Sequence, residues 1–157
     1  MSTTTENARP TGIAGGSWEA GVVGGIVGAA VMGALIVLMN DAVIAVAIPS
    51  LYTLAPPQSP TAGLFVHISH GAVLGVVFAG IAGAVGADST GKLLGLGAVW
   101  GVATWVVLAA LVMPVWLGAV GSPASPPLPN FAPPSLLWHV VYGVVLGGVY
   151  AGLADRF

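Results

Sequence analysis

"LFVHISHGAVLGVVFAGIA", residues 64–82, is an apolar stretch that recurs near the end of the chain as "LLWHVVYGVVLGGVYAGLA", residues 136–154. Ten of the nineteen aligned positions are identical, including a histidine and the glycines four and eight residues after it. Each copy is close to the length of about 20 residues that a helix needs to cross the hydrocarbon core of a membrane. The repeat therefore predicts two similar membrane-spanning helices.

The composition places the whole chain in a membrane. Of its 157 residues, 57% are hydrophobic and 5% are charged, and the mean hydropathy is +1.00. A soluble domain has about 25% charged residues, so most of this surface must face the lipid bilayer. The sequence has no basic patch, which excludes nucleic acid as a partner. It has no cysteine, which excludes disulfides and thiolate metal sites.

Four apolar runs are long enough to span a membrane, and none alternates as a β-barrel strand would. They cover residues 21–39, 64–85, 93–113 and 136–154. We therefore predict an all-α integral membrane protein with four transmembrane helices in residues 17–157. Residues 1–16 are predicted to form a disordered cytoplasmic tail.

The repeat also predicts how the four helices are related. The second and fourth helices carry the copied stretch, and the first and third end in the similar strings "ALIVLM" (34–39) and "LAALVM" (108–113). Each of these strings is followed by a break, at Asn40–Asp41 or at Pro114. We therefore predict two tandem helical hairpins, residues 21–85 and 93–154, related by parallel pseudo-twofold symmetry.

The few basic residues predict the orientation. Arg9, Lys92 and Arg156 all fall on one side of a four-span chain, whereas the Pro-rich segments 40–63 and 114–135 contain no lysine or arginine. The positive-inside rule then places both termini in the cytoplasm and the Pro-rich loops outside the cell membrane.

Glycines at four-residue spacing predict how the helices pack, because such rows let two helix backbones approach closely in lipid. The rows are Gly71 and Gly75, Gly143 and Gly147, Gly97 and Gly101, and Gly24 and Gly28. We expect the copied faces to pair the second helix directly with the fourth at the centre of the bundle.

The repeated histidines are the candidate site. His67 and His139 lie at equivalent positions near the outer ends of their helices, and ionisable residues inside a membrane often mark function. Two facing imidazoles could ligate haem b or a copper or zinc ion, with Asp41, His70 and Tyr142 as second-shell partners. The structural alternative is that each histidine reaches water or a carbonyl group near the interface. We expect no cofactor, and we keep haem b or copper as the alternative.

Enzymatic function is not predicted. "GADSTGKL", residues 86–93, approaches a phosphate-binding loop, but Leu93 replaces the hydroxyl residue and the stretch only connects two membrane spans. We therefore expect no nucleotide. No Ser–His–Asp set or intramembrane carboxylate pair is present either.

The pattern H-x3-G-x3-G-x2-aromatic occurs at 67–78 and 139–150, and the third helix ends in "WVVLAALVMP", residues 105–114. With these motifs, residues 21–154 resemble a family of small four-span membrane proteins, the DUF6789 group. The resemblance implies the four-helix fold and implies no activity.

Three functions follow from these observations. The first is a non-catalytic accessory or scaffold component that packs with a larger membrane complex or with itself as a homo-oligomer. The alternative is a haem- or metal-binding membrane electron carrier that uses His67 and His139. The third is a small transporter, which is disfavoured because the helices lack obvious mid-membrane breaks and polar residues.

Overall fold

The computed structural model describes residues 17–157, which form helices and connecting loops without a β-strand in this range. Four helical spans are long and apolar enough to cross a membrane. They are Trp18–Ser50, Pro60–Ala84, Thr90–Ala119 and Pro133–Leu153. This confirms the predicted all-α class with four membrane-spanning helices. The predicted disordered tail, residues 1–16, lies outside the described residues.

The first and third spans are composite, whereas the second and fourth are continuous. The first consists of α1 (Trp18–Ala42), the π-helix η2 (Val43–Ala47) and α2 (Ile48–Ser50), and the second is α3 (Pro60–Ala84). The third consists of α4 (Thr90–Thr104), the π-helix η3 (Trp105–Val112) and α5 (Met113–Ala119), and the fourth is α6 (Pro133–Leu153). Hairpin A is residues 18–84, and hairpin B is residues 90–153.

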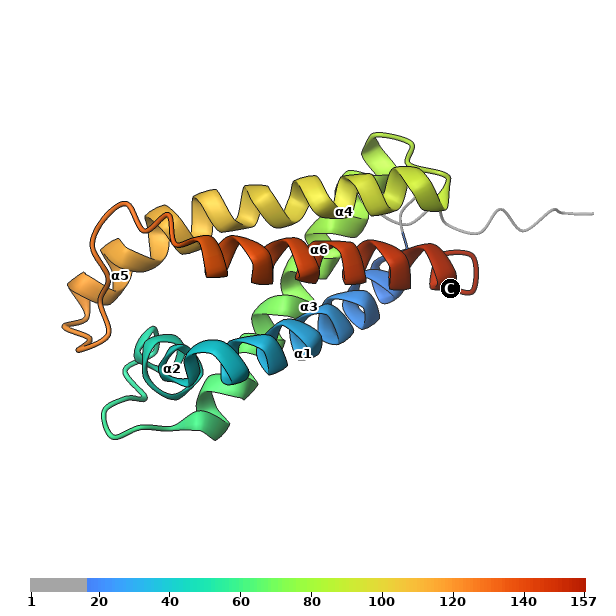
Figure 1. Ribbon diagram of the computed structural model, residues 1–157. Helices are drawn as coiled ribbons and strands as arrows, with labels where there is room; N and C mark the ends of the chain where they lie inside the picture. The colour runs from blue at the N-terminus through green and yellow to red at the C-terminus, as the bar shows by residue number, and fades with distance from the viewer. Residues whose placement is uncertain (1–16) are drawn as a thin grey trace, which may run out of the picture.

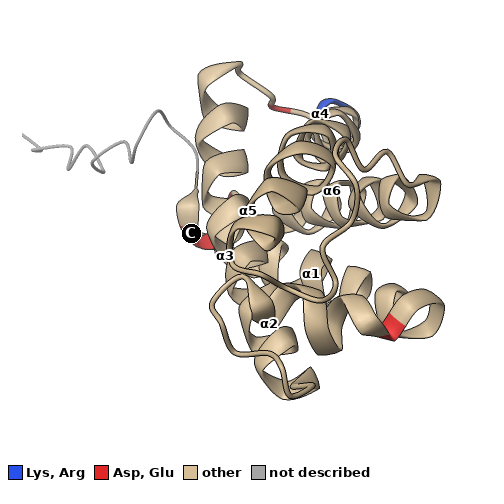
Figure 2. Ribbon diagram, turned by 90° about the vertical axis from the view of Figure 1, so that its left-hand side faces the viewer, with Lys and Arg blue, Asp and Glu red and all other residues tan. Residues whose placement is uncertain are grey.

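The helices lie in the spatial order α3, α1, α6, α4 (Figures 1 and 2). α1 packs against both α3 and α6, and α4 packs against α6. Residues 51–59 and 120–132 connect the helices at one end, which we call the loop end; residues 85–89 and the C-terminus lie at the tail end (Figure 1). The predicted central pairing of the second helix with the fourth is therefore wrong, because α1 separates their backbones.

Glycines hold each hairpin together. A Cβ atom added at Gly25 would overlap the carbonyl oxygen of Gly71 across α1 and α3, and one added at Gly97 would overlap that of Gly143 across α4 and α6. Each residue of the second contact follows its counterpart by 72 positions, which is also the spacing of the repeat. These close glycine contacts lie within each hairpin. The pseudo-twofold symmetry stays a prediction.

The remaining glycines of α1 serve a different contact. Gly24 and Gly28 face Leu146 and Tyr142 of α6, whereas Gly21 and Gly25 face α3. α1 thus has two glycine rows, one for each neighbour, and this is why it can lie between α3 and α6.

Prolines explain the irregular ends of the first and third spans. Pro49 and Pro114 each follow a π-helical segment by two residues. Because proline has no N–H, the carbonyl four residues earlier loses its helical partner. The chain replaces that partner in both hairpins: the amide of Ser59 donates to Ala45 O (2.8 Å), and that of Asn130 donates to Ala110 O (2.9 Å). The predicted break at Pro114 is wrong, because the chain stays helical from Thr90 to Ala119, whereas Asn40 has the non-helical backbone angles expected of a break.

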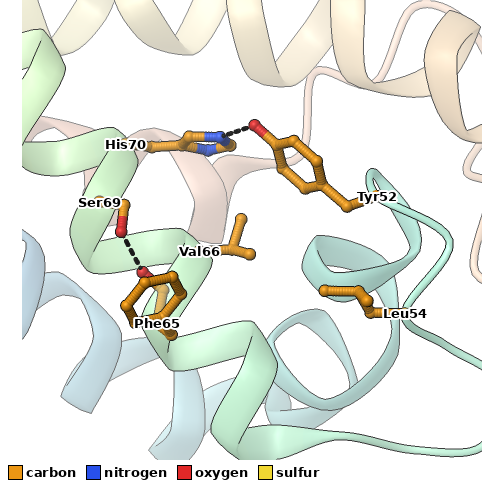
Figure 3. A pocket seen from close by; sticks show the side chains of 6 residues that line it. All are labelled: Tyr52, Leu54, Phe65, Val66, Ser69 and His70. Carbon is orange, nitrogen blue, oxygen red and sulfur yellow. Dashed lines mark hydrogen bonds between the residues drawn. The ribbon is translucent and has the colours of Figure 1, made fainter.

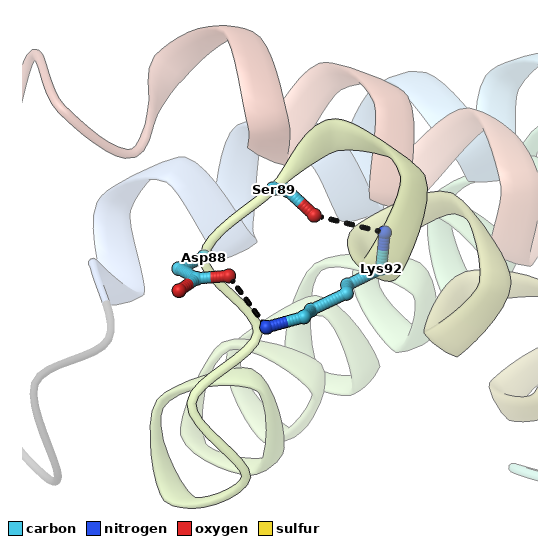
Figure 4. Close-up of polar contacts among 3 residues, drawn as sticks. All are labelled: Asp88, Ser89 and Lys92. Atoms are coloured by element: carbon cyan, nitrogen blue, oxygen red, sulfur yellow. Dashed lines mark hydrogen bonds and ion pairs between the residues drawn. The ribbon is translucent and has the colours of Figure 1, made fainter.

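The tail end is closed by packing and hydrogen bonds. The rings of Phe78 and Tyr150 meet edge to face with centroids 5.6 Å apart, and Phe78 is fully buried. The Tyr150 hydroxyl accepts a hydrogen bond from the Ser17 amide at the start of α1. In the short connection to α4, Lys92 Nζ donates to an Asp88 carboxylate oxygen at 2.8 Å on the exposed surface (Figure 4).

Candidate functional site

A large cavity lies between the two hairpins toward the loop end, where Figure 1 shows the hairpins diverging. Its volume is about 1040 Å³. All four spans and the segment 124–134 contribute residues to its wall. Most of the lining is apolar, and the polar exceptions include His67, His139, Tyr142 and Thr104.

The cavity exists because the hairpins pack asymmetrically. α1 meets α6 through Gly24 and Gly28, but the equivalent positions of α4, 72 residues later, are Leu96 and Trp100. These larger side chains prevent α4 from approaching α3 as closely as α1 approaches α6. The bundle is therefore closed along α1 and α6 and open between the other two helices.

His67 is held against the neighbouring helix. Its side chain is 8% exposed, and its Nε2 donates to the carbonyl oxygen of Ala29 on α1 at 3.0 Å. Because a carbonyl can only accept, the proton of the neutral ring lies on Nε2, and Nδ1 keeps a free lone pair. The ring fits there because α1 has a glycine beside it: a Cβ added at Gly33 would lie 3.2 Å from His67 Cδ2.

His139 makes a different contact although it occupies the equivalent position. Its Nδ1 donates to Ser135 O, one turn earlier in its own helix, at 2.7 Å. The residue of hairpin B that corresponds to Gly33 is Trp105, so hairpin B has a large side chain at the position where α1 has none. His139 therefore keeps its Nε2 free. Both predicted histidines line one cavity, but their bonded nitrogens differ.

Tyr142 and Thr104 complete the polar part of the wall. The Tyr142 hydroxyl donates to Gly71 O of α3 at 2.9 Å, and this bond links the hairpins. The Thr104 hydroxyl donates to backbone oxygens of its own helix, 2.9 Å from Trp100 O and 3.0 Å from Gly101 O. Tyr142 was predicted as a second-shell residue, and it lies in the cavity wall. Thr104 was missed, since a threonine in an apolar helix gives no sequence signal.

A smaller pocket of about 300 Å³ adjoins the large cavity (Figure 3). Tyr52 and His70 line both spaces, and their side chains are joined by a 2.8 Å hydrogen bond between the Tyr52 hydroxyl and His70 Nε2. Phe65 and Leu54, both largely exposed, lie on the outer side of the pocket. His70 thus lies in the cavity wall together with Tyr52, which was not among the predicted site residues.

Asp41 does not join the site. Its side chain is exposed, and the cavity wall includes its neighbour Asn40 instead. The predicted second-shell role of Asp41 beside the histidines is therefore wrong for this arrangement, because the helix is kinked at Asn40. Within residues 17–157, no three His, Cys, Asp or Glu side chains gather as a metal-ligand cluster.

Two residues at the loop end bring the hairpins together over the cavity. The Trp116 indole donates to Leu51 O at 2.9 Å, which joins α5 to the end of α2. On the opposite side, the Trp138 indole donates to Met39 Sδ at 3.1 Å. Neither pairing follows from the sequence, because the partners are a backbone oxygen and a thioether far away in the sequence.

Comparisons of the chain with protein-family models, with curated proteins and with solved structures gave no match. The resemblance of residues 21–154 to the four-span family stays a prediction. The functional argument therefore depends on the cavity and its lining.

Proposed function

We propose that this chain is a non-catalytic multi-pass membrane protein that holds an apolar molecule in the cavity between its hairpins. The observation that carries the proposal is the volume of about 1040 Å³, with a mostly apolar wall and a few polar side chains. Ligand sites typically have about 300–1,000 Å³ and this kind of lining. The space is much larger than the voids of packed protein interiors, which supports a binding role.

Photolabelling tests the proposal. The purified protein in lipid nanodiscs is irradiated with hexadecane that bears a diazirine group, and the labelled residues are mapped by mass spectrometry. We expect labelling of cavity-lining residues in addition to residues that face lipid. The variant Leu108→Trp should reduce the cavity labels because Leu108 lines the cavity.

The matched control is Val107→Trp, on the neighbouring residue of η3, which is 52% exposed and is not in the cavity wall. It should leave the cavity labels unchanged. Labels confined to lipid-facing residues, or lost equally in both variants, would contradict the proposal.

A haem- or copper-binding electron carrier is the second candidate, and the observation that favours it is that His67 and His139 line the same cavity. Ligation through both Nε2 atoms would require His67 to give up its bond to Ala29 O. The absorption spectrum and metal content of the purified protein test this candidate. Stoichiometric haem or copper that is lost in both His67→Gln and His139→Gln would replace the first proposal.

We further propose that the tail end faces the cytoplasm of the cell membrane. Lys92 and Arg156 both lie at this end, which supports the positive-inside assignment. A membrane-impermeant thiol reagent applied to intact cells should label Gln58→Cys, at the loop end, and leave Ser89→Cys unlabelled. The reverse pattern would invert the assignment.

The accessory or scaffold role and the small transporter stay predictions. The kink at Asn40 and the two π-helical segments weaken the argument against a transporter, since they interrupt helices that were expected to be regular. Co-purification of a partner, or self-association in nanodiscs, would favour the accessory role over a carrier that acts alone.

A further inference from the structure

The two histidines in the cavity wall have already used their hydrogen-bond donors. In each neutral ring one nitrogen donates to a backbone oxygen, Nε2 of His67 to Ala29 and Nδ1 of His139 to Ser135. The other nitrogen of each ring can only accept. Both rings therefore offer lone pairs and no N–H group to a ligand.

The hydroxyl groups of Tyr142 and Thr104, which also line the cavity, have likewise used their hydrogen-bond donors. The Tyr142 hydroxyl donates its proton to Gly71 O, and the Thr104 hydroxyl donates to the backbone of its own helix. What remains on each oxygen is acceptor capacity. The Tyr142 oxygen faces the indole N–H of Trp100. We therefore call the other three groups the acceptor set: His67 Nδ1, His139 Nε2 and Thr104 Oγ1.

The free nitrogens of the acceptor set can be reached from the cavity. Among the described residues, the side-chain nitrogen and oxygen atoms that are both buried and unpartnered are the indole nitrogens of Trp100 and Trp105. His67 Nδ1 and His139 Nε2 are not among them, so they keep contact with open space. Both residues line the cavity, and the cavity is that space.

We infer that the ligand carries a hydrogen-bond donor, and that it is a neutral apolar molecule ending in a hydroxyl group, such as a long-chain or isoprenoid alcohol. This inference depends on the proposed function. Beside the acceptor set, an aldehyde, an ether or a quinone would place its oxygen against lone pairs and leave these groups unpaired. The wall also contains side chains with donor groups, Asn40, Asn130 and Ser135, so the inference applies to the part of the wall that the acceptor set forms. A protonated amine would bury a charge, and the described cavity wall contains no Asp or Glu to pair with it.

Paired probes test this inference on the full chain in detergent micelles. Farnesol and farnesyl methyl ether share one apolar skeleton, and they differ in that the ether lacks the O–H donor. Binding is followed by the fluorescence of the tryptophans, two of which, Trp116 and Trp138, line the cavity. After correction for partition into empty micelles, farnesol should bind at least about tenfold more tightly, which corresponds to about 1.4 kcal/mol.

Variants of the acceptor set locate the effect. Thr104→Val, which keeps the shape of the side chain, and His139→Phe should each lower the preference for farnesol several-fold. Met113→Leu is the control: Met113 lines the same cavity but contributes no group to the acceptor set, and the preference should stay unchanged. Circular dichroism verifies that each variant is folded. If one of the two acceptor variants does not fold, the other still tests the inference.

The outcomes separate this inference from the proposed function. Equal affinity for the two probes, or an equal effect of Met113→Leu, would overturn the hydroxyl inference and leave the cavity as a ligand site. Binding of neither probe would also overturn it. Whether the proposed function fails as well is then decided by the hexadecane photolabel, which makes no hydrogen bond.

Discussion

Hairpins A and B contain the same glycine contacts, yet several equivalent residues around these contacts differ. Within each hairpin, Gly71 and Gly143 lie against Gly25 and Gly97 in the same register. Outside these contacts Gly24, Gly28 and Gly33 correspond to the larger residues Leu96, Trp100 and Trp105. The comparison shows that the repeat specifies the hairpin, and that a few non-equivalent residues specify how the two hairpins meet.

The histidines show this most clearly. His67 reaches α1 beside Gly33, which leaves room for its ring. His139 instead bonds within α6, and hairpin B has Trp105 at the position equivalent to Gly33. Identical residues at equivalent positions therefore have different partners. A functional role that requires the two imidazoles to act identically does not follow from the repeat alone.

The largest effect should come from breaking the shared glycine contact. Gly75→Leu and Gly147→Leu would drive a side chain into the backbone oxygens of Gly21 and Leu93. We expect each to lower the free energy of unfolding by about 3 kcal/mol, measured by circular dichroism during SDS titration. Similar losses in the two hairpins would support the common register.

The controls for this prediction are Gly80→Leu and Gly152→Leu, which are also equivalent to each other. A Cβ atom at either position meets no other atom of the described chain within 4 Å. These variants should change the free energy of unfolding by less than about 0.5 kcal/mol. If they destabilise as much as the first pair, the assignment of the packed faces is wrong.

A smaller loss of stability should follow from breaking the contact of Gly28 with α6, because the equivalent residue of α4 is not a glycine. In Gly28→Leu the new Cβ would lie 2.9 Å from Tyr142 O and 3.0 Å from its ring, between α1 and α6. We expect a loss of about 2 kcal/mol in the same titration. Gly95→Leu on α4, where the added atom meets nothing described within 4 Å, is the control. No difference between the two would show that the α1–α6 contact is loose.

The two histidines should then differ in their contribution to stability. His67→Ala removes a buried hydrogen bond between helices and should cost about 1.5 kcal/mol. His139→Ala removes a bond within one helix from a half-buried residue and should cost about 0.5 kcal/mol. Equal losses in thermal unfolding would indicate that the two rings have equivalent surroundings after all.

The smallest effect concerns the connection between the hairpins. The hydrogen bond from Lys92 lowers the pKa of the Asp88 carboxyl group, and the lysine charge adds to this shift. The resulting stabilisation is present above the ordinary aspartate pKa, about 3.9, and disappears as the pH falls through the lowered folded pKa. Because the pair is fully exposed, the effect should be slight.

Unfolding midpoints of the wild type and of Asp88→Asn, measured between about pH 6 and pH 3, check this prediction. The difference between them should shrink as the pH falls. A difference that grows toward acid pH would have the wrong sign and would contradict the assigned shift.

Much of the fold could be predicted because the lipid bilayer constrains the length of the helices and the residues at their contacts. A helix must be about 20 apolar residues long, and close helix contacts in lipid favour small residues. The prediction ended the first span at 39, however, and the structure continues it to Ser50 through η2. The extension was missed because Asn40–Asp41 indicated a break, whereas the helix resumes after the kink at Asn40. At Pro49 the amide of Ser59 replaces the lost bond to Ala45 O.

The candidate site was predictable only in part. The sequence by itself determined the four spans, the glycine faces, and the placement of His67 and His139 at equivalent heights in their helices. Only the tertiary structure decided that α1 lies between α3 and α6, that a cavity of about 1040 Å³ opens between the hairpins, and which nitrogen of each ring faces it. The physical reason is that these features depend on contacts over different distances along the chain. Span length and glycine spacing act within one or two neighbouring helices, whereas the cavity depends on the side-chain sizes at positions such as Gly28 and Trp100, which meet different partners once the hairpins pack together.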